Sequence, residues 1–195
     1  MSYGIKLDDI QKGIEDIIRT DPKMIIGFKS KLVTDEMWEY AIAMEPRLFP
    51  LCKKKTYRIC MLALARDGFY LSDVDPINYT GDQYKSLCRT AVEQNPKAIA
   101  IVPKEFQSND LVAYAYAQDP ELMLNEKKLT PSMLESIIDH NPSLIQYVVQ
   151  PSDELVIRAL ERDPRVIVHC KNVTEKVRDY LEETYPQYAA MFLHQ

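Results

Sequence analysis

Residues 91–99 read Ala-Val-Glu-Gln-Asn-Pro-Lys-Ala-Ile, and shorter versions of this stretch recur further along the chain. Residues 137–142 read Ile-Ile-Asp-His-Asn-Pro, and residues 159–164 read Ala-Leu-Glu-Arg-Asp-Pro. Each copy holds two apolar residues, two polar residues, an Asp or Asn and a proline, in that order. A pattern that returns in this way indicates an internal repeat, and the repeat decides the class of fold.

Seven of the twelve prolines stand in this context, and Gly68 takes the place of proline in an eighth copy. We name these eight residues the anchors: Pro22, Pro46, Gly68, Pro96, Pro120, Pro142, Pro164 and Pro186. Their successive spacings are 24, 22, 28, 24, 22, 22 and 22 residues. Tetratricopeptide, ankyrin and HEAT repeats are longer, at about 33 residues or more. The spacing therefore predicts a shorter repeat.

Twelve residues before the anchor, six of the eight copies carry a hydroxyl side chain, which is typical of a helix N-cap. These residues are Thr34, Thr56, Ser108, Thr130, Ser152 and Thr174. Between cap and anchor, apolar residues fall eight, five and four positions before the anchor, as Trp38, Ala41 and Ile42 do before Pro46. This spacing lines one face of a helix. We therefore expect a helix of about three turns ahead of each anchor.

An Asp or Asn followed by proline predicts that a second helix starts at the anchor, because the missing N–H of proline costs nothing at the first helical position. Neither helix can bury its apolar stripe alone, so the hairpins must stack on one another. The sequence thus predicts an all-α protein, an α-solenoid of about eight short helix-turn-helix repeats in a single domain over residues 1–195. The units start near residues 8, 34, 56, 80, 108, 130, 152 and 174.

The interval between Gly68 and Pro96 is the strongest irregularity in the repeat. Residues 71–83 are rich in Asp, Pro and Gly, and they lengthen this spacing to 28 residues. We predict that residues 71–83 form an inserted, protruding loop. The last copy carries Tyr185 in place of Asp or Asn, as expected of a capping unit.

The stretches 91–99, 137–142 and 159–164 resemble a short helical-hairpin repeat of about 22 residues. That repeat belongs to a family of unknown function seen in large DNA viruses, phages and some bacteria. The resemblance covers nearly the whole chain through the repeat pattern. It implies a helical repeat architecture, and it supplies no activity and no functional residue.

The composition is typical of a soluble globular protein, with 24 Lys+Arg against 29 Asp+Glu, a net charge of −5 and 46% hydrophobic residues. The longest apolar runs are much shorter than the roughly 18 residues that a membrane span needs. Residues 1–9 lack the apolar core of a secretory signal. We expect a cytoplasmic protein without membrane contact. The four cysteines form no C-x-x-C pair, so we expect no disulfide framework, no metal and no cofactor.

Residue types that could carry catalysis do not converge in the sequence. His169 stands beside Cys170, but adjacent residues on a helix do not face each other, as a Cys/His nucleophile pair requires. The acidic residues Asp73, Asp75 and Asp82 lack the ligand ladder and terminal Glu of a calcium loop. We therefore predict that the protein is not an enzyme. A pocket beneath residues 71–83 is the place where an enzyme site would lie.

Charge is placed periodically along the repeat. Lysines recur seven to nine residues after the anchors: Lys29, Lys31, Lys53, Lys54, Lys55, Lys104, Lys127, Lys128 and Lys171. Acids recur one and three residues before the anchors, so one edge of the repeat is expected to be basic and the other acidic. Two interpretations are open. The charges complement the helix dipoles, by roughly 0.3 to 1 kcal/mol each, or the lysine edge docks an acidic partner.

Three tyrosines complete the predicted partner-binding set. Tyr40 and Tyr114 lie six residues before an anchor, and Tyr147 lies five residues after one. Tyrosine exposed in a groove is a common hot-spot residue. The other explanation is partly buried packing with the hydroxyl in water.

These observations favour a non-enzymatic protein–protein interaction module, such as an adaptor or inhibitor, because solenoids present an extended surface. The resemblance to viral and phage proteins points to a host factor as the partner. The alternative is a nucleic-acid-binding repeat protein that uses the lysine-rich edge. The sequence leaves the oligomeric state open.

Overall fold

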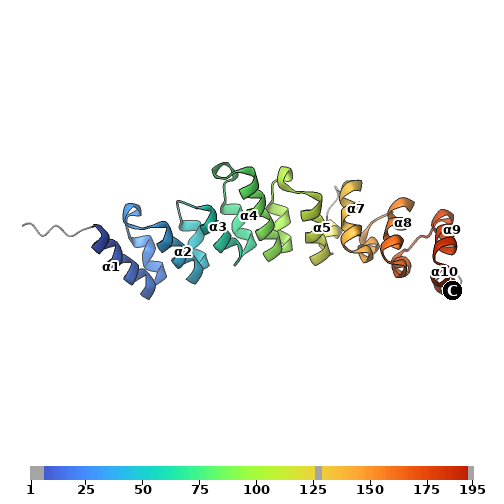
Figure 1. Ribbon diagram of the computed structural model, residues 1–195, viewed down its shortest axis with the longest axis horizontal. Coiled ribbons are helices and arrows are strands. Elements are labelled where there is room, and N and C mark those ends of the chain that lie inside the picture. Colours follow the sequence, from blue (N-terminus) through green and yellow to red (C-terminus); the bar gives the residue numbers. More distant parts are fainter. Residues whose placement is uncertain (1–6, 126–128, 193–195) are drawn as a thin grey trace, which may run out of the picture. The chain divides into compact units, whose positions relative to one another are not determined.

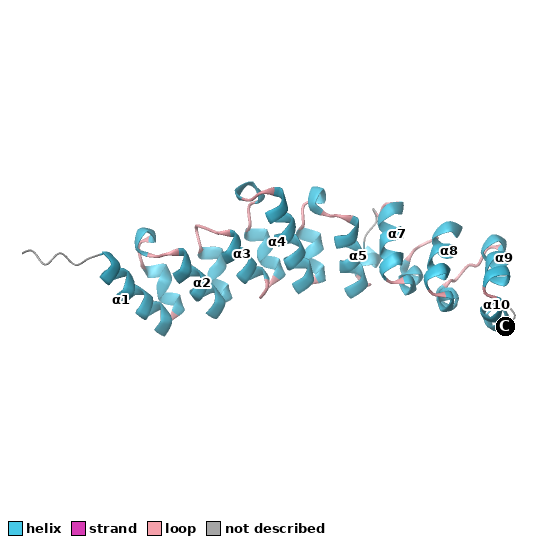
Figure 2. Cartoon of the chain, in the orientation of Figure 1, coloured by secondary structure: helices cyan, strands magenta, loops and turns pink. Residues whose placement is uncertain are grey.

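The computed structural model describes residues 7–125 and 129–192, and all regular structure in these residues is helical. The prediction of an all-α protein is therefore confirmed for the described part of the chain. α-Helices alternate with short 3-10 helices along much of the chain. Loops join the helices (Figures 1 and 2). The chain divides into two compact units, Met1–Val102 and Pro103–Gln195. We name them the N-terminal and C-terminal units and describe each by itself.

The N-terminal unit begins with a long α-helix and continues as hairpins of one α-helix and one or two 3-10 helices. Its elements are α1 (Leu7–Thr20), η1 (Pro22–Gly27), η2 (Ser30–Leu32), α2 (Asp35–Met44), η3 (Pro46–Leu51), α3 (Tyr57–Leu64), η4 (Gly68–Asp73), η5 (Pro76–Asn78), α4 (Gly81–Gln94) and η6 (Pro96–Ile101).

The C-terminal unit repeats the same alternation, except that the helix after the anchor is α-helical in two of its hairpins. Its elements are η7 (Lys104–Phe106), α5 (Asn109–Gln118), α6 (Leu122–Asn125), α7 (Pro131–His140), η8 (Pro142–Tyr147), α8 (Asp153–Arg162), η9 (Pro164–His169), α9 (Glu175–Thr184) and α10 (Pro186–Phe192).

The hydroxyl N-caps predicted from the sequence are confirmed at all six positions. Each side-chain oxygen accepts a hydrogen bond from the backbone N–H three residues later, as Thr34 does from Met37 at 3.3 Å. The remaining five caps are Thr56, Ser108, Thr130, Ser152 and Thr174. Each cap satisfies one of the backbone N–H groups that a helix start leaves without a partner.

The second helix of the hairpin also starts where the Asp/Asn-Pro pattern predicts, but it is a six-residue 3-10 helix in six copies. At Asn95 the side chain accepts from the Lys97 N–H, and the carbonyl accepts from the Ala98 N–H three residues on. The i→i+3 bond is the pattern of a 3-10 helix. It also forms at Glu45, where the Leu48 N–H donates to the carbonyl and no side-chain cap is present. At Tyr185, which has no carboxylate or amide, the carbonyl accepts from both the Tyr188 N–H at 2.9 Å and the Ala189 N–H at 3.1 Å, and α10 is an α-helix.

The apolar positions predicted from the repeat form the core of each unit. The residues five and four before the anchor are both buried in six of the eight copies, as Ala41 and Ile42 are. In the first copy Ile17 is 43% exposed, and in the last copy Glu182 is an exposed polar residue.

Four other core residues predicted from the repeat are not buried. Two residues after an anchor, Met24 is 48% exposed and Leu122 is half-buried. Eight residues before an anchor, Trp38 and Leu134 are half-buried.

Consecutive hairpins pack on one another within each unit. In the N-terminal unit α2 contacts η1 before it and α3 after it, and α3 contacts α4. In the C-terminal unit α7 contacts α5 and α8, and η8 contacts η9. The core of each unit is therefore built between hairpins as well as within them.

Residues 71–83 do not form the protruding loop that the sequence predicts. Residues 71–73 end η4, residues 76–78 form η5, and residues 81–83 begin α4 behind a capping box between Thr80 and Gln83. The link between hairpins runs here from the anchor Gly68 to the next helix cap, Thr80. It is as long as the links after Pro22 and Pro96, which also contain an extra 3-10 helix. The additional four residues lie in α4, which is one turn longer than α2.

Gly68 marks a close approach between two hairpins, which explains why this anchor is not a proline. A Cβ atom on Gly68 would overlap the backbone carbonyl of Ala91 in α4. The Gly68 N–H donates to Oε1 of Gln94 at 2.6 Å, and Nε2 of Gln94 donates to the Arg66 carbonyl at 3.2 Å. Proline has neither the N–H nor the space for this junction.

We predict that Gly68→Ala lowers the free energy of unfolding by about 1–3 kcal/mol or more, because backbone atoms must move to admit the methyl group. Gly13→Ala is the matched control. Gly13 lies exposed within α1 with no atom near its Cβ position, so this change should raise stability by up to about 1 kcal/mol. Urea unfolding followed by far-UV circular dichroism measures both, and a Gly68→Ala protein as stable as the parent contradicts the close approach.

Candidate functional site

The lysines predicted to form a basic edge lie in the links between hairpins, or at the ends of 3-10 helices. Lys29, Lys31, Lys53, Lys104 and Lys171 are exposed to solvent. Lys127 and Lys128 lie outside the described residues. In the part of the chain that the structure describes, none of Lys29, Lys31, Lys53 and Lys171 has an ion-pair partner.

The three consecutive lysines of the N-terminal unit have different surroundings. Lys53 is exposed. Nζ of Lys54 lies 2.7 Å from Oδ2 of Asp35, in an ion pair whose lysine side chain is 76% exposed. Nζ of Lys55 donates to the Cys52 carbonyl at 2.8 Å and lies 5.1 Å from the centre of the buried Phe49 ring. Lys53 and Lys54 are therefore available to a partner, whereas Lys55 is part of the fold.

A groove of about 580 Å³ lies among these lysines in the N-terminal unit. Its apolar lining comes from α2 and from the helices and links on either side: Ile25, Ile26, Phe28, Val33, Trp38 and Leu51. Its polar lining is Lys29, Ser30, Asp35, Lys53 and Lys54. Ile26 is 59% exposed and Leu51 is 54% exposed, so the groove keeps large apolar side chains in contact with water.

The C-terminal unit carries a groove of about 530 Å³ at the same repeat positions. Ile145 corresponds to Ile25, three residues after an anchor, and Lys171 corresponds to Lys53, seven residues after the next anchor. Tyr147 lines this groove as well. The groove is thus a product of the repeat, although its chemistry differs between the two units.

A smaller groove of about 300 Å³ adjoins it in the C-terminal unit, between α7 and α8. Leu134, which takes the repeat position of Trp38, lines this groove together with Val149. Val149 is 89% exposed. Trp38 and Leu134 are therefore half-buried for the same reason, because each lines a groove.

The predicted tyrosines do not act as a set. Tyr40 donates its hydroxyl to the Arg19 carbonyl at 3.4 Å, and the Arg19 guanidinium lies 5.0 Å from its ring centre. Tyr114 is half-buried on α5 and lines none of the three grooves. Only Tyr147 lines a groove. The sequence analysis missed Trp38, Ile26 and Leu51, because it assigned Trp38 to the core and gave the other two no role.

The acidic edge is used within the fold. Asp21, Asp67 and Asp163 accept hydrogen bonds from backbone N–H groups at the starts of 3-10 helices. Nε and Nη2 of Arg158 donate to the two carboxylate oxygens of Asp139 at 2.9 and 2.7 Å. These side-chain bonds hold the pKa of Asp139 below its usual range. Helix-start and ion-pair roles account for these acids without a ligand.

Burial works against nucleophilic chemistry at the cysteines. Sγ of Cys170 donates to the Val166 carbonyl at 3.6 Å, and burial raises the pKa of its thiol. Burial also raises the pKa of Cys88 to about 12. A nucleophilic cysteine needs a lowered pKa, because the thiolate is the reactive form.

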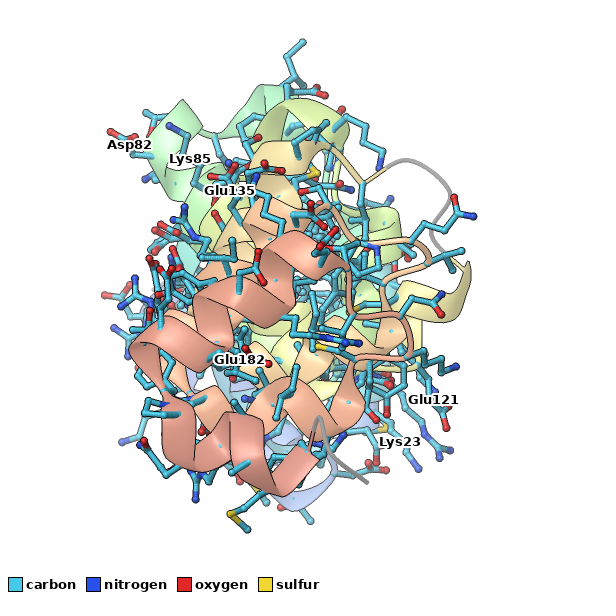
Figure 3. All side chains as sticks on the ribbon, turned by 90° about the vertical axis from the view of Figure 1, so that its right-hand side faces the viewer. Lys23, Asp82, Lys85, Glu121, Glu135 and Glu182 are labelled. Carbon is cyan, nitrogen blue, oxygen red and sulfur yellow. The ribbon has the colours of Figure 1, made fainter. Side chains whose placement is uncertain are left out.

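No group of three His, Cys, Asp or Glu side chains suited to a metal ion occurs among residues 7–125 and 129–192. Of the predicted acidic cluster, Asp75 caps η5, and Asp82 points into solvent from α4 with its carboxylate 3.9 Å from Nζ of Lys85 (Figure 3). No helix in the described residues is both long and apolar enough to cross a membrane.

Comparison of the chain with family models, with curated proteins and with solved structures gives no match.

We predict that Asp139→Asn lowers stability at neutral pH and that the loss shrinks as the pH falls. A carboxylate whose pKa is lower in the folded state contributes stability above its unfolded pKa of about 3.9, and the contribution is lost as the pH falls through the folded pKa. Thermal unfolding at a series of pH values measures the difference from the parent. Asp179→Asn, at an exposed site on α9, is the control. A difference that stays constant down to acid pH contradicts the role of the charge.

We predict that Lys53→Glu changes the free energy of unfolding by less than about 0.5 kcal/mol, because Lys53 is exposed. Lys55→Glu should lower it by about 1–2 kcal/mol, because it removes a hydrogen bond and a cation–π contact. Urea unfolding of the two variants checks this separation. Equal changes in the free energy of unfolding would contradict the prediction that Lys53 is free whereas Lys55 stabilises the fold.

Proposed function

We propose that this chain is a protein-binding repeat protein in which each unit is a short α-solenoid and the edge that holds the links binds the partner. The observation that carries the proposal is the pair of grooves at the same repeat positions in the two units. Both retain apolar side chains in contact with water, as at Leu51 and Val149. Large apolar side chains that gather at an exposed concave surface are typical of binding sites.

The solenoid arrangement is supported by the contacts between consecutive hairpins within each unit. Stacked short repeats commonly present a continuous surface to a partner. A non-enzymatic role as an adaptor or inhibitor fits a surface made of grooves and free lysines. Cytoplasmic location and a host protein as partner, which the resemblance to viral and phage repeats favours, belong to the same proposal.

Nucleic-acid binding is the second candidate, and the free lysines Lys29, Lys31 and Lys53 of the N-terminal unit favour it. Two features oppose it. Acidic residues outnumber basic residues by 29 to 24 over the whole chain. The lysines surround an apolar groove that contains Trp38 and Leu51, whereas a nucleic-acid surface is expected to be densely basic.

An affinity pull-down from a lysate of the natural host tests the proposal, with half of the lysate treated with nuclease and mass spectrometry applied to both halves. We expect one protein to be captured in stoichiometric amount and to survive nuclease treatment. Loss of every captured component after nuclease treatment would contradict protein binding and favour the nucleic-acid candidate. In that case affinity for an oligonucleotide should fall steeply as salt rises.

A further inference from the structure

The groove of the N-terminal unit has a charge opposite to that of the chain as a whole. Three lysines and one aspartate line it, whereas the chain carries a net charge of −5. Lys29 and Lys53 have no ion-pair partner among the described residues. The pair between Lys54 and Asp35 is largely exposed, and such pairs contribute little, so Lys54 can exchange its partner.

The groove also has apolar lining residues that the fold leaves uncovered. Trp38 is half-buried, and it is the only tryptophan of the chain. Ile26 and Leu51 are more than half exposed at the same groove. A space of about 580 Å³ accommodates one or two large side chains of a partner, since ligand sites commonly span about 300 to 1,000 Å³.

From this combination we infer that the N-terminal groove binds a peptide segment that carries an aromatic or large aliphatic residue flanked by Asp or Glu. The apolar side chain packs against Trp38 and Leu51, and the carboxylates pair with Lys29 and Lys53. Charge complementarity selects this occupant, because a basic or neutral segment would leave the lysines unpaired. The inference rests on the proposed protein-binding function and specifies the chemistry of the partner.

The corresponding groove of the C-terminal unit should prefer different peptides from those that the N-terminal groove binds. It keeps Lys171 at the position of Lys53, but Val149 and Gln150 stand where Lys29 and Ser30 stand in the N-terminal groove. This difference supplies a matched control. Reversing the charge of Lys171 alters the same repeat position without touching the N-terminal groove.

Selection of short random peptides against the full chain, from a library built without tryptophan, tests the inference. We expect enrichment of sequences that combine Asp or Glu with Phe, Leu or Ile. The enriched peptides should alter the fluorescence of Trp38 and bind the Lys29→Glu/Lys53→Glu protein at least tenfold more weakly. The Lys171→Glu protein should bind them as the parent does. Circular dichroism verifies the fold of each variant. Two further variants separate the contributions to peptide binding: Lys29→Gln/Lys53→Gln removes the charge, and Leu51→Gln removes an apolar lining residue.

Several outcomes would overturn the inference. One is that the selection enriches basic or uncharged peptides. Another is that the parent protein enriches no more peptide than the Lys29→Glu/Lys53→Glu protein does. A third is that the enriched peptides bind the parent and this variant equally well. A Trp38 signal that responds to an oligonucleotide instead assigns the groove to nucleic acid. A signal that depends on protein concentration alone assigns it to a second copy of the chain. A partner captured from lysate and retained by Lys29→Glu/Lys53→Glu leaves protein binding intact while removing this groove from it.

Discussion

Within each unit the described hairpins pack against their neighbours, and their helices are too short to be stable alone. Most of the α-helices span 8 to 14 residues, and the 3-10 helices span six or fewer. Isolated helices of this length are marginal in water. The buried stripe, exemplified by Ala41 and Ile42, is covered only when the next hairpin packs against it. Side-chain caps fix where most of the α-helices begin, at positions such as Thr34 and Ser152, so that their apolar stripes face the neighbouring hairpin.

The grooves follow from the same constraint. A hairpin whose second helix is a 3-10 helix leads into a link, and the links of consecutive hairpins leave a hollow beside the α-helix between them. The residue eight positions before the anchor forms part of a groove wall in two places: Trp38 lines the N-terminal groove, and Leu134 lines the smaller groove of the C-terminal unit. Because the repeat fixes the position of the groove, residues in the links can vary its charge without disturbing the core.

Local features of the fold, such as helix starts, could be predicted from the sequence. The degree of burial of individual side chains could not, because it depends on the packing of neighbouring hairpins. The six hydroxyl caps and the starts at Asp or Asn are decided by residues a few positions apart. Exposure of Trp38 depends on the neighbouring hairpin, so its spacing alone assigned it to the core. The prediction of a loop over residues 71–83 was wrong, because the spacing of 28 residues combines the longer type of link, which also follows Pro22 and Pro96, with an extra turn of α4. Among the predicted site residues, Lys29, Lys53 and Lys54 meet at one groove, whereas Lys55 and Tyr40 are occupied by internal contacts.

Deletion of one repeat tests the dependence of each hairpin on its neighbour most directly. Removing residues 152–173 takes out one period of 22 residues and joins Pro151 to the next helix cap, Thr174. The shortened protein should keep its helix content per residue and a cooperative thermal transition, because one capped hairpin replaces another. Removing residues 152–162 alone deletes α8, the first helix of the hairpin that contains η9, and this protein should lose the cooperative transition. Equal tolerance of the two deletions, or loss of folding in both, would contradict a fold built from 22-residue units that stabilise one another.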